Sequence, residues 1–259
     1  MQAIRELLHH SYLILSFARR DVRARYKQTA LGAAWAVLQP LSLMIVFTLV
    51  FDRVARIPTD GTPYPIFSYS ALIFWAFFST SMTQGTLAMT ANSNLVRKIY
   101  FPRETLLLAV LLSASLDLAI ACVMLAVLMV MYGITVTWAV LWVPVLLAVQ
   151  VLFTFALVCL TSAVHVYFRD IGHALTLGLQ LWMFATPVAY PMSVVPEAVR
   201  PLYLLNPMAP LIDGYRRAIV YGESPALARI GIVLVVVLVL MSFTYLGFKR
   251  AERTFADVI

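Results

Sequence analysis

Residues 25–40 read RYKQTALGAAWAVLQP, a stretch that begins with basic residues and continues as an apolar helix containing a proline. It opens the first long hydrophobic run of the chain. Five cations lie directly before that run: Arg19, Arg20, Arg23, Arg25 and Lys27. Basic residues beside an apolar run of about 20 residues are typical of a transmembrane helix whose charged end stays in the cytoplasm. The stretch therefore predicts an integral membrane protein and its orientation.

The composition predicts the same class of protein. Hydrophobic residues make up 62% of the chain and charged residues 12%, against roughly 45–50% and about 25% in soluble domains. The net charge of +7 does not point to nucleic acid, because in a membrane protein the location of the charges matters more than their sum. Cys122 and Cys159 fall inside apolar runs, so neither a disulfide nor a zinc site is indicated. The charged residues before the first run, and the lack of a small-residue cleavage site after it, argue against a cleavable signal peptide.

Six stretches are long enough to span a bilayer, at roughly 20 residues each. They are Leu31–Phe51, Ile66–Met89, Thr105–Met131, Trp138–Tyr167, Gly172–Tyr190 and Ile230–Phe248. Pro187 and Pro191 interrupt the far end of the fifth stretch. No stretch alternates like a barrel strand, so the expected fold is an all-α integral membrane protein in one domain, residues 1–259.

The lysines and arginines orient these spans. With the N-terminus inside, 13 of the 19 fall in inner segments and 6 in outer segments. The excess marks the cytoplasmic side, so both termini are expected there. The inner cations are Arg5, Arg19, Arg20, Arg23, Arg25, Lys27, Arg97, Lys98, Arg103, Arg169, Lys249, Arg250 and Arg253.

The residues before the first span predict an amphipathic helix. Its apolar residues recur at helical spacing, with Arg5, His9 and His10 between them: Ile4, Leu7, Leu8, Tyr12 and Leu15. Such a helix rests in the membrane interface with its apolar face down. One interpretation is a topology signal and lipid anchor. The other is a collar at a cytoplasmic entrance, where Arg and Lys meet an anionic phosphate.

The inner loop TANSNLVRKIYFPRE, residues 90–104, predicts a short surface helix. Asn92, Ser93 and Asn94 are helix-capping residue types, and Phe101-Pro102 ends the helix. The helix is basic and apolar at once. It is either an ordinary amphipathic connector or a segment that docks into the groove of a partner.

The outer segment TPVAYPMSVVPEAVRPLYLLNPMAPLIDGYRRAIVYGESP, residues 186–225, holds seven of the 13 prolines. Such a density excludes one continuous helix. It predicts two short re-entrant helices, Pro196–Leu205 and Pro210–Tyr221, which must be covered by protein or line a cavity. The alternative is an ordinary extracellular cap.

Catalytic motifs are missing from the sequence. It has no G-x-x-x-x-G-K-[ST] phosphate loop, no metal-binding histidine spacing and no G-x-S-x-G elbow, so we expect no catalytic, cofactor or metal site in this chain. Asp117, in SASLDLAIA, is the one acid deep in a span. It is either a functional group or a helix-to-helix hydrogen-bond partner. A proton- or ion-coupled carrier usually has a richer set of intramembrane charges.

Four motifs together resemble one family. They are RDVRARYKQTALGAAWAVLQPL at 20–41, NSNLVRKIYFPRE at 92–104, YFRDIGH at 167–173, and TPVAYPMSVVPE with LYLLNPMAPLIDGYRRAIVYG between 186 and 222. Over nearly its full length the chain resembles the membrane-spanning permease of type-2 ABC exporters for polysaccharides and polyol phosphates, such as O-antigen, capsule or teichoic acid. A type-2 ABC exporter of a drug or lipid, and an ATPase-independent carrier, are the alternatives.

The resemblance implies a homodimer in the bacterial cytoplasmic (inner) membrane, with two copies of a separate cytoplasmic ATPase that binds the ATP and Mg²⁺. The substrate implied is a glycan linked to undecaprenyl pyrophosphate. The chain divides into a cytoplasmic interfacial helix at 1–30, spans 1–5 at 31–190, an external re-entrant segment at 191–228, span 6 at 229–248 and a cytoplasmic tail at 249–259.

The resemblance also assigns roles to residues. Coupling to the ATPase falls near 92–103, on Asn94, Leu95, Arg97, Lys98, Tyr100, Phe101, Pro102 and Arg103. The cytoplasmic gate that meets the pyrophosphate comprises Arg19, Arg20, Arg23, Arg25, Tyr26 and Lys27. The external gate comprises Pro196, Tyr203, Asn206, Pro207, Asp213 and Arg216.

Aromatic residues supply a candidate sugar path, because aromatic faces stack weakly and repeatedly on sugar rings. The candidates for lining a channel are Trp35, Phe47, Phe51, Tyr69, Phe74, Trp75, Phe78, Trp182, Phe184 and Tyr190. The alternative is that these residues pack in the membrane core or form interfacial belts.

Overall fold

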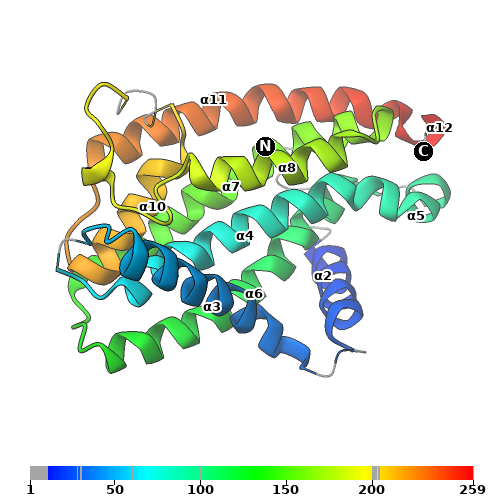
Figure 1. Ribbon diagram of the computed structural model, residues 1–259. Helices are drawn as coiled ribbons and strands as arrows, with labels where there is room; N and C mark the ends of the chain where they lie inside the picture. Colours follow the sequence, from blue (N-terminus) through cyan, green and yellow to red (C-terminus); the bar gives the residue numbers. More distant parts are fainter. Residues whose placement is uncertain are drawn as a thin grey trace.

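The computed structural model describes residues 11–27, 29, 31–59, 61–99, 101–199, 203 and 205–258. These residues form helices and connecting loops without a β-strand among them, as the all-α prediction requires (Figure 1). The α-helices are α2 (Ser11–Tyr26), α3 (Trp35–Phe47), α4 (Tyr64–Ala91), α5 (Ser93–Lys98), α6 (Glu104–Met131), α7 (Trp142–Tyr167), α8 (Ile171–Phe184), α10 (Met208–Arg216), α11 (Leu227–Ala251) and α12 (Phe255–Val258). Short 3₁₀ or π segments extend several of them: η1 (Gly32–Ala34), η2 (Thr48–Val54), η3 (Trp138–Leu141), η4 (Met192–Val194), η5 (Arg217–Tyr221) and η6 (Glu252–Thr254).

Five helical stretches are long and apolar enough to cross a membrane. They are Gly32–Val54, Tyr64–Ala91, Glu104–Met131, Trp138–Tyr167 and Leu227–Thr254. Each contains or closely overlaps one of the predicted spans.

The predicted span Gly172–Tyr190 is not a continuous helix. Helix α8 has 14 residues, about 21 Å at a rise of about 1.5 Å per residue, against a hydrocarbon core of about 30 Å. The helix ends at Phe184 because Pro187 has no N–H to donate and disfavours the helical conformation at the residue before it. The chain continues through Thr186–Tyr190 as irregular, largely buried backbone.

Helix α4 is the centre of the bundle, and nineteen of its 28 residues are buried. It packs on α6 and α7 along their length and also contacts α3, α8 and α10. Phe74 of α4 stacks on Tyr215 of α10 with ring centroids 3.6 Å apart. Gln150 of α7 joins this contact, since its Nε2 donates to the Phe74 carbonyl and its Oε1 accepts from the Tyr215 hydroxyl. Helix α4 therefore fixes the positions of the helices around it.

The long helices run between two ends of the molecule, which we call the α5 end and the α10 end (Figure 1). Helices α5 and α12 lie at the α5 end and contact each other. Helix α10 and the loops around it lie at the opposite end. Helix α11 lies along α7, and α2 packs against α6. The α5 end is thus the end to which the sequence assigns most of the basic residues.

Helix α2 packs on the bundle through a face other than the predicted apolar face, which is expected to rest in the membrane interface. Its buried residue is Ala18, and Phe17 packs on Phe101 with ring centroids 5.9 Å apart. Tyr12 and Leu15 are exposed. Residues 1–10, which carry the rest of the predicted apolar face, lie outside the described residues.

The predicted surface helix after α4 is shorter than expected. Helix α5 covers Ser93–Lys98, and Ile99 is already extended. Asn92 does not cap α5, because its side-chain amide donates to the Ala88 carbonyl at 2.8 Å and so closes the end of α4. The helix that was predicted to end at Phe101-Pro102 therefore ends earlier, at Lys98, and Tyr100 lies outside the described residues.

Candidate functional site

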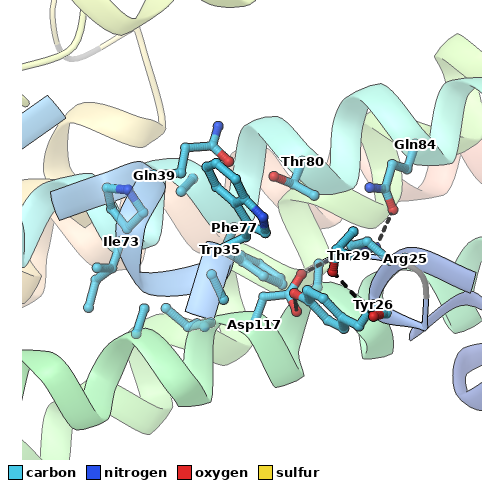
Figure 2. A pocket seen from close by; sticks show the side chains of 16 residues that line it. Arg25, Tyr26, Thr29, Trp35, Gln39, Ile73, Phe77, Thr80, Gln84 and Asp117 are labelled. Atoms are coloured by element: carbon cyan, nitrogen blue, oxygen red, sulfur yellow. Dashed lines mark hydrogen bonds and ion pairs between the residues drawn. The ribbon is translucent and has the colours of Figure 1, made fainter. Parts of the chain in front are cut away.

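Asp117 holds three helices together near the α5 end. Its carboxylate forms an ion pair with Arg25 of α2, whose Nη2 also donates to Gln84 Oε1 of α4 at 2.6 Å. The Tyr26 hydroxyl donates to the same carboxylate at 2.6 Å. Figure 2 shows these side chains converging at one end of a cavity of about 310 Å³. The acid deep in the third span is therefore a helix-to-helix partner, the second of the two interpretations of Asp117.

The electrostatics of this cluster keep Tyr26 protonated. Burial, together with the hydrogen bond and negative charge of Asp117, raises the pKa of its phenol to about 12. A protonated phenol can donate to the carboxylate, so Arg25 and Tyr26 together neutralise and satisfy Asp117. We call Arg25, Tyr26, Gln84 and Asp117 the α2 latch.

The rest of the predicted basic strip points away from the latch. Arg20 pairs with Asp21 at 2.9 Å. Arg19, Arg23 and Lys27 form no ion pair with the described part of the chain and follow one face of α2 at a spacing of four residues. With Arg20, Tyr12 and Leu15 they line a shallow cavity of about 520 Å³. The six predicted gate residues thus divide between a structural cluster and an exposed basic face.

A polar groove runs over α4 between α3 and α8. Its volume is about 490 Å³, and it has no charged residue in its lining. Hydroxyl and amide side chains face it: Gln39 from α3, Ser79, Thr80, Thr83 and Gln84 from α4, and Thr176 and Gln180 from α8. Gln39, Ala76, Thr80 and Gln84 also line the cavity beside the latch, so the two spaces adjoin.

The polar stripe on α4 is the main feature that the sequence reasoning missed. Residues 76, 79, 80, 83, 84, 87 and 90 form its exposed or half-buried face, while most of the intervening residues are buried. A signal exists in FWAFFSTSMTQGTLAMT, residues 74–90, where hydroxyl and amide residues recur at helical spacing. The same helix is rich in aromatic residues, and the prediction of a channel lining was based on those residues instead.

The predicted channel aromatics divide into two groups. Tyr69, Phe74 and Phe78 are enclosed among helices, where Phe78 packs on Phe153 and Phe74 on Tyr215. Phe47 is buried and packs edge-on against the half-buried Phe51, and Phe184 is exposed. This packing matches the alternative that aromatic residues fill a membrane core.

Two of the predicted aromatics face the open spaces. Trp35 is exposed and lines the cavity beside the latch, and Trp75 lines the polar groove. Trp182 packs behind Trp75 and donates through its indole N–H to Asn206 at 2.9 Å.

The predicted external-gate residues gather around the irregular segment that follows α8. Asn206 donates to the Ala185 carbonyl and to the Thr186 hydroxyl, while its oxygen accepts from Trp182. The Tyr190 and Tyr203 hydroxyls share a hydrogen bond of 2.7 Å. Pro207 precedes α10, and Pro196 lies in the turn after η4.

Arg216 binds the irregular segment after α8 from inside the protein. It is 1% exposed and donates to the carbonyls of Pro187 and Val188 at 3.0–3.1 Å. Its guanidinium carbon lies 3.7 Å from the centre of the Phe67 ring. These carbonyls follow the end of α8 and have no helical partner, so a buried cation satisfies backbone that Pro187 has freed.

The segment predicted as the second re-entrant helix is helical, as α10 followed by η5, and nearly all of it is buried. Asp213 is half-buried and pairs with Arg217 at 3.3 Å. Most of the residues between Pro196 and Leu205 that would form the first re-entrant helix lie in or beside gaps of the described chain. The backbone N–H of Tyr203 donates to the Val199 carbonyl at 3.4 Å.

The predicted coupling residues lie at the α5 end on two surfaces. Asn94, Arg97 and Lys98 are exposed on α5, and Ile99 after them is 56% exposed. Leu95 is half-buried. Phe101 is 7% exposed under α2, and Arg103 lies over the Phe255 ring of α12.

An ion-pair cluster that the sequence reasoning did not single out fixes this end. Glu104, at the start of α6, is 1% exposed and pairs with Lys249 of α11 at 2.8 Å. Glu252 pairs with the same lysine at 3.2 Å, and the Tyr245 hydroxyl donates to Glu104 at 3.3 Å. The cluster ties the last long helix to the segment that follows α5.

Comparisons with known proteins define the class. The model of the ABC-2 type transporter family matches residues 12–220, so the chain belongs to that family of membrane-spanning transporter subunits. The chain is 35% identical over 244 residues to an O-antigen export system permease protein, RfbA, of Myxococcus xanthus, covering 90% of this chain and 92% of that relative. It is 28% identical over 246 residues to RfbA of Klebsiella pneumoniae (93% and 94% covered) and 22% identical over 214 residues to the polysialic acid transport protein KpsM of Escherichia coli (78% and 79%).

Proposed function

We propose that this chain is the permease subunit of an ABC exporter that moves a lipid-linked polysaccharide of the O-antigen type across the cytoplasmic membrane. The polar groove over α4 carries this proposal, because it gathers seven hydroxyl and amide side chains on otherwise apolar helices and adjoins the cavity beside the latch. The relatives named for O-antigen export, similar along nine tenths of the chain, support the choice of polysaccharide as cargo.

The chemistry of the groove suits a chain that must slide. Hydroxyl and amide groups form hydrogen bonds with sugar hydroxyls, and each such bond contributes only about 0.5–1.5 kcal/mol net. The groove lining contains no charge that would hold one register strongly. Trp75 in the groove and Trp35 in the adjoining cavity add aromatic faces. Many weak, similar contacts allow successive sugars to exchange places at low cost.

The open side of the groove favours a homodimer. Gln39 and Gln180 are exposed, although both lie on apolar helices. Hydrocarbon cannot satisfy their amides, so a polar surface at membrane depth must line a water-filled or protein-covered space. A second copy that covers the groove with its own groove would form a closed polar channel between two protomers.

The energy is supplied from outside the chain. We assign ATP and Mg²⁺ to two copies of a separate cytoplasmic ATPase, which dock on α5 and the residues that follow it. With the α5 end in the cytoplasm of a bacterial cell, both termini lie inside, and α8 with the irregular segment after it completes the sixth crossing. The exposed basic face of α2 then attracts the anionic head of the substrate toward the entrance.

Removal of the gene from its native host tests this function. We expect one surface polysaccharide to disappear while its lipid-linked form accumulates inside the cell, and we expect a tagged protein to co-purify with an ABC ATPase. Unchanged surface glycans in the deletion strain contradict a polysaccharide substrate and favour export of a drug or a lipid. A protein that brings no ATPase contradicts every ABC interpretation.

A further inference from the structure

A second cavity lies at the α5 end, beside the entrance to the groove. Its volume is about 680 Å³, and its lining comes from α4, the start of α5, the end of α7 and the first turns of α8. The lining includes Arg169, His165, His173 and Ser93 and no acidic residue. Thr83 and Thr176 line both this cavity and the polar groove, so the two spaces adjoin.

His165 gives the cavity an unsatisfied polar group. Its side chain is 95% buried, since the residue is 5% exposed, and its Nδ1 forms no hydrogen bond within the described residues. A buried polar atom without a partner is costly unless a ligand or water satisfies it. Gly172 packs closely on the ring, since a Cβ at that position would lie only 3.3 Å from His165 Cε1.

The charges around this space favour an anion. Arg169 is exposed and forms no ion pair with the described part of the chain, and His173 is exposed on the first turn of α8. The positive end of the α8 dipole adds to both. Asp170 precedes α8, but it is not part of the lining. An arginine offers two parallel donors, which suit the oxygens of a phosphate group.

On the side that adjoins the polar groove, the cavity is lined by threonine hydroxyls. The hydroxyls of Thr83 and Thr176 donate to the carbonyls of Ser79 and Gly172 in their own helices, at 2.9 and 3.0 Å. Their oxygens therefore offer lone pairs to the cavity, and lone pairs suit the hydroxyls of a sugar. Cationic donors on one side and hydroxyl acceptors on the other match a diphosphate joined to its first sugar.

We propose that the cavity lined by His165, Arg169 and His173 binds the diphosphate head of the lipid-linked substrate, with the first sugar directed into the polar groove. This inference rests on the proposed function and locates the head of its substrate. It moves the binding of the diphosphate from the strip on α2, where Arg25 is held by Asp117, to the space between α4, α7 and α8. Ser93 belongs to the lining and to α5, so an occupied site also contacts the proposed coupling helix.

Binding of farnesyl pyrophosphate to the full chain in phosphatidylcholine nanodiscs tests the site. We expect inorganic pyrophosphate to compete and farnesol not to bind. Arg169→Gln and His173→Gln should each weaken binding about tenfold, since a hydrogen bond to a charged group contributes about 1.5–3 kcal/mol and 1.4 kcal/mol is a factor of ten. Arg169→Lys should lose less. The matched control, Arg53→Gln at the other end of the first span, should stay within about twofold.

A measurement without substitution complements the variants. Pyrophosphate should slow the carbethoxylation of His173 in the wild-type chain, as followed by mass spectrometry. The same rate with and without pyrophosphate overturns the proposal.

Three outcomes of the binding experiment also overturn it. Loss of binding in Arg23→Gln but not in Arg169→Gln places the diphosphate on α2. An equal loss in Arg53→Gln shows a nonspecific charge effect. Displacement of farnesyl pyrophosphate by phosphatidylglycerol in the nanodisc shows a site for phospholipid headgroups. None of these outcomes affects the proposed function, which depends on the phenotype of the deletion strain.

Discussion

Two arginines, one near each end of the bundle, are held in opposite ways. Arg216, toward the α10 end, is 1% exposed and donates to backbone carbonyls that have no other helical partner. Arg25, toward the α5 end, is partly exposed and bound by the side chains of Asp117 and Gln84 beside a cavity. Backbone carbonyls cannot move without unfolding the segment, whereas side chains can exchange partners. The segment that Arg216 binds at the α10 end is therefore held more rigidly than the contacts of Arg25 at the α5 end.

The largest loss of stability is expected when the contacts of Arg216 at the α10 end are removed. Arg216→Met should lower the free energy of unfolding by about 3–5 kcal/mol, because at least two buried carbonyls lose a charged donor. Thermal unfolding in detergent, followed by circular dichroism, measures the change.

Its neighbour provides the matched control. Arg217 has a 39% exposed side chain and pairs with Asp213 and Glu223 at 3.3 Å. Surface pairs contribute about 0–1 kcal/mol, so Arg217→Gln should change stability by no more than that. Equal losses in the two variants would mean that Arg216 does not close the segment after α8.

The α2 latch should give a smaller and separable effect. Asp117→Asn should cost about 1–3 kcal/mol, because it leaves Arg25 without its charged partner. The double variant Arg25→Gln with Asp117→Asn should cost less than the sum of the single variants, with a coupling energy of about 1–2 kcal/mol. Chemical denaturation of the four proteins in the cycle measures it.

Arg23→Gln serves as the control for the latch, since Arg23 is exposed two residues away and should change stability by about 0.5 kcal/mol or less. Additive losses within the cycle would show that the ion pair does not hold α2 on α6. The contacts that hold α2 at the α5 end would then have to be sought elsewhere.

Some features of this fold could be predicted from the sequence alone. The long spans were predicted closely because about 20 consecutive apolar residues have one stable solution in a bilayer. The proline-rich composition of residues 186–225 likewise predicted that no continuous helix runs through them, and α8 ends at Phe184. Such features depend on local composition, and local composition is visible in a single sequence.

The failures are contacts between distant residues. Arg25 and Asp117 are 92 positions apart, and no local sequence pattern predicts their pairing. The length of α8 depends on whether another residue can satisfy the carbonyls freed near Pro187, and Arg216 does so from 29 positions away. Tertiary partners decide these points.

The docking surface at the α5 end gives the third prediction. Ile99→Asp should weaken the association with the ATPase about five- to tenfold, because Ile99 is 56% exposed directly after α5 and a charge there cannot enter an apolar groove. Phe101, at 7% exposure beneath α2, is unsuitable for this test, since its replacement disturbs packing inside the protein. Co-purification with a tagged ATPase at several salt concentrations measures the effect.

Val136→Asp is the matched control for Ile99→Asp. Val136 is 72% exposed in the loop before η3, at the α10 end, where no ATPase is expected. It should leave the association unchanged. If both variants bind alike, the ATPase contacts a different part of the α5 end.

The smallest effect concerns the polar groove over α4, and two serines make the comparison. Ser79 lines the groove on α4 and donates to the Ala76 carbonyl at 3.2 Å. Ser242 is exposed on α11 and donates to the Leu238 carbonyl at 2.8 Å. Both hydroxyls make a backbone hydrogen bond within their own helix, so replacing either with alanine should have a similar, small effect on stability.

Only Ser79 should matter for transport. Ser79→Ala removes one weak contact to a passing sugar, and a contact of about 0.5 kcal/mol corresponds to a change of about two- to threefold in the export rate. Ser242→Ala should export at the wild-type rate. The rate of appearance of surface polysaccharide after induction, at matched protein levels, measures both. An effect of the same size in the two variants would show that α4 does not line the path, and the groove would then be a surface between protomers without a passage.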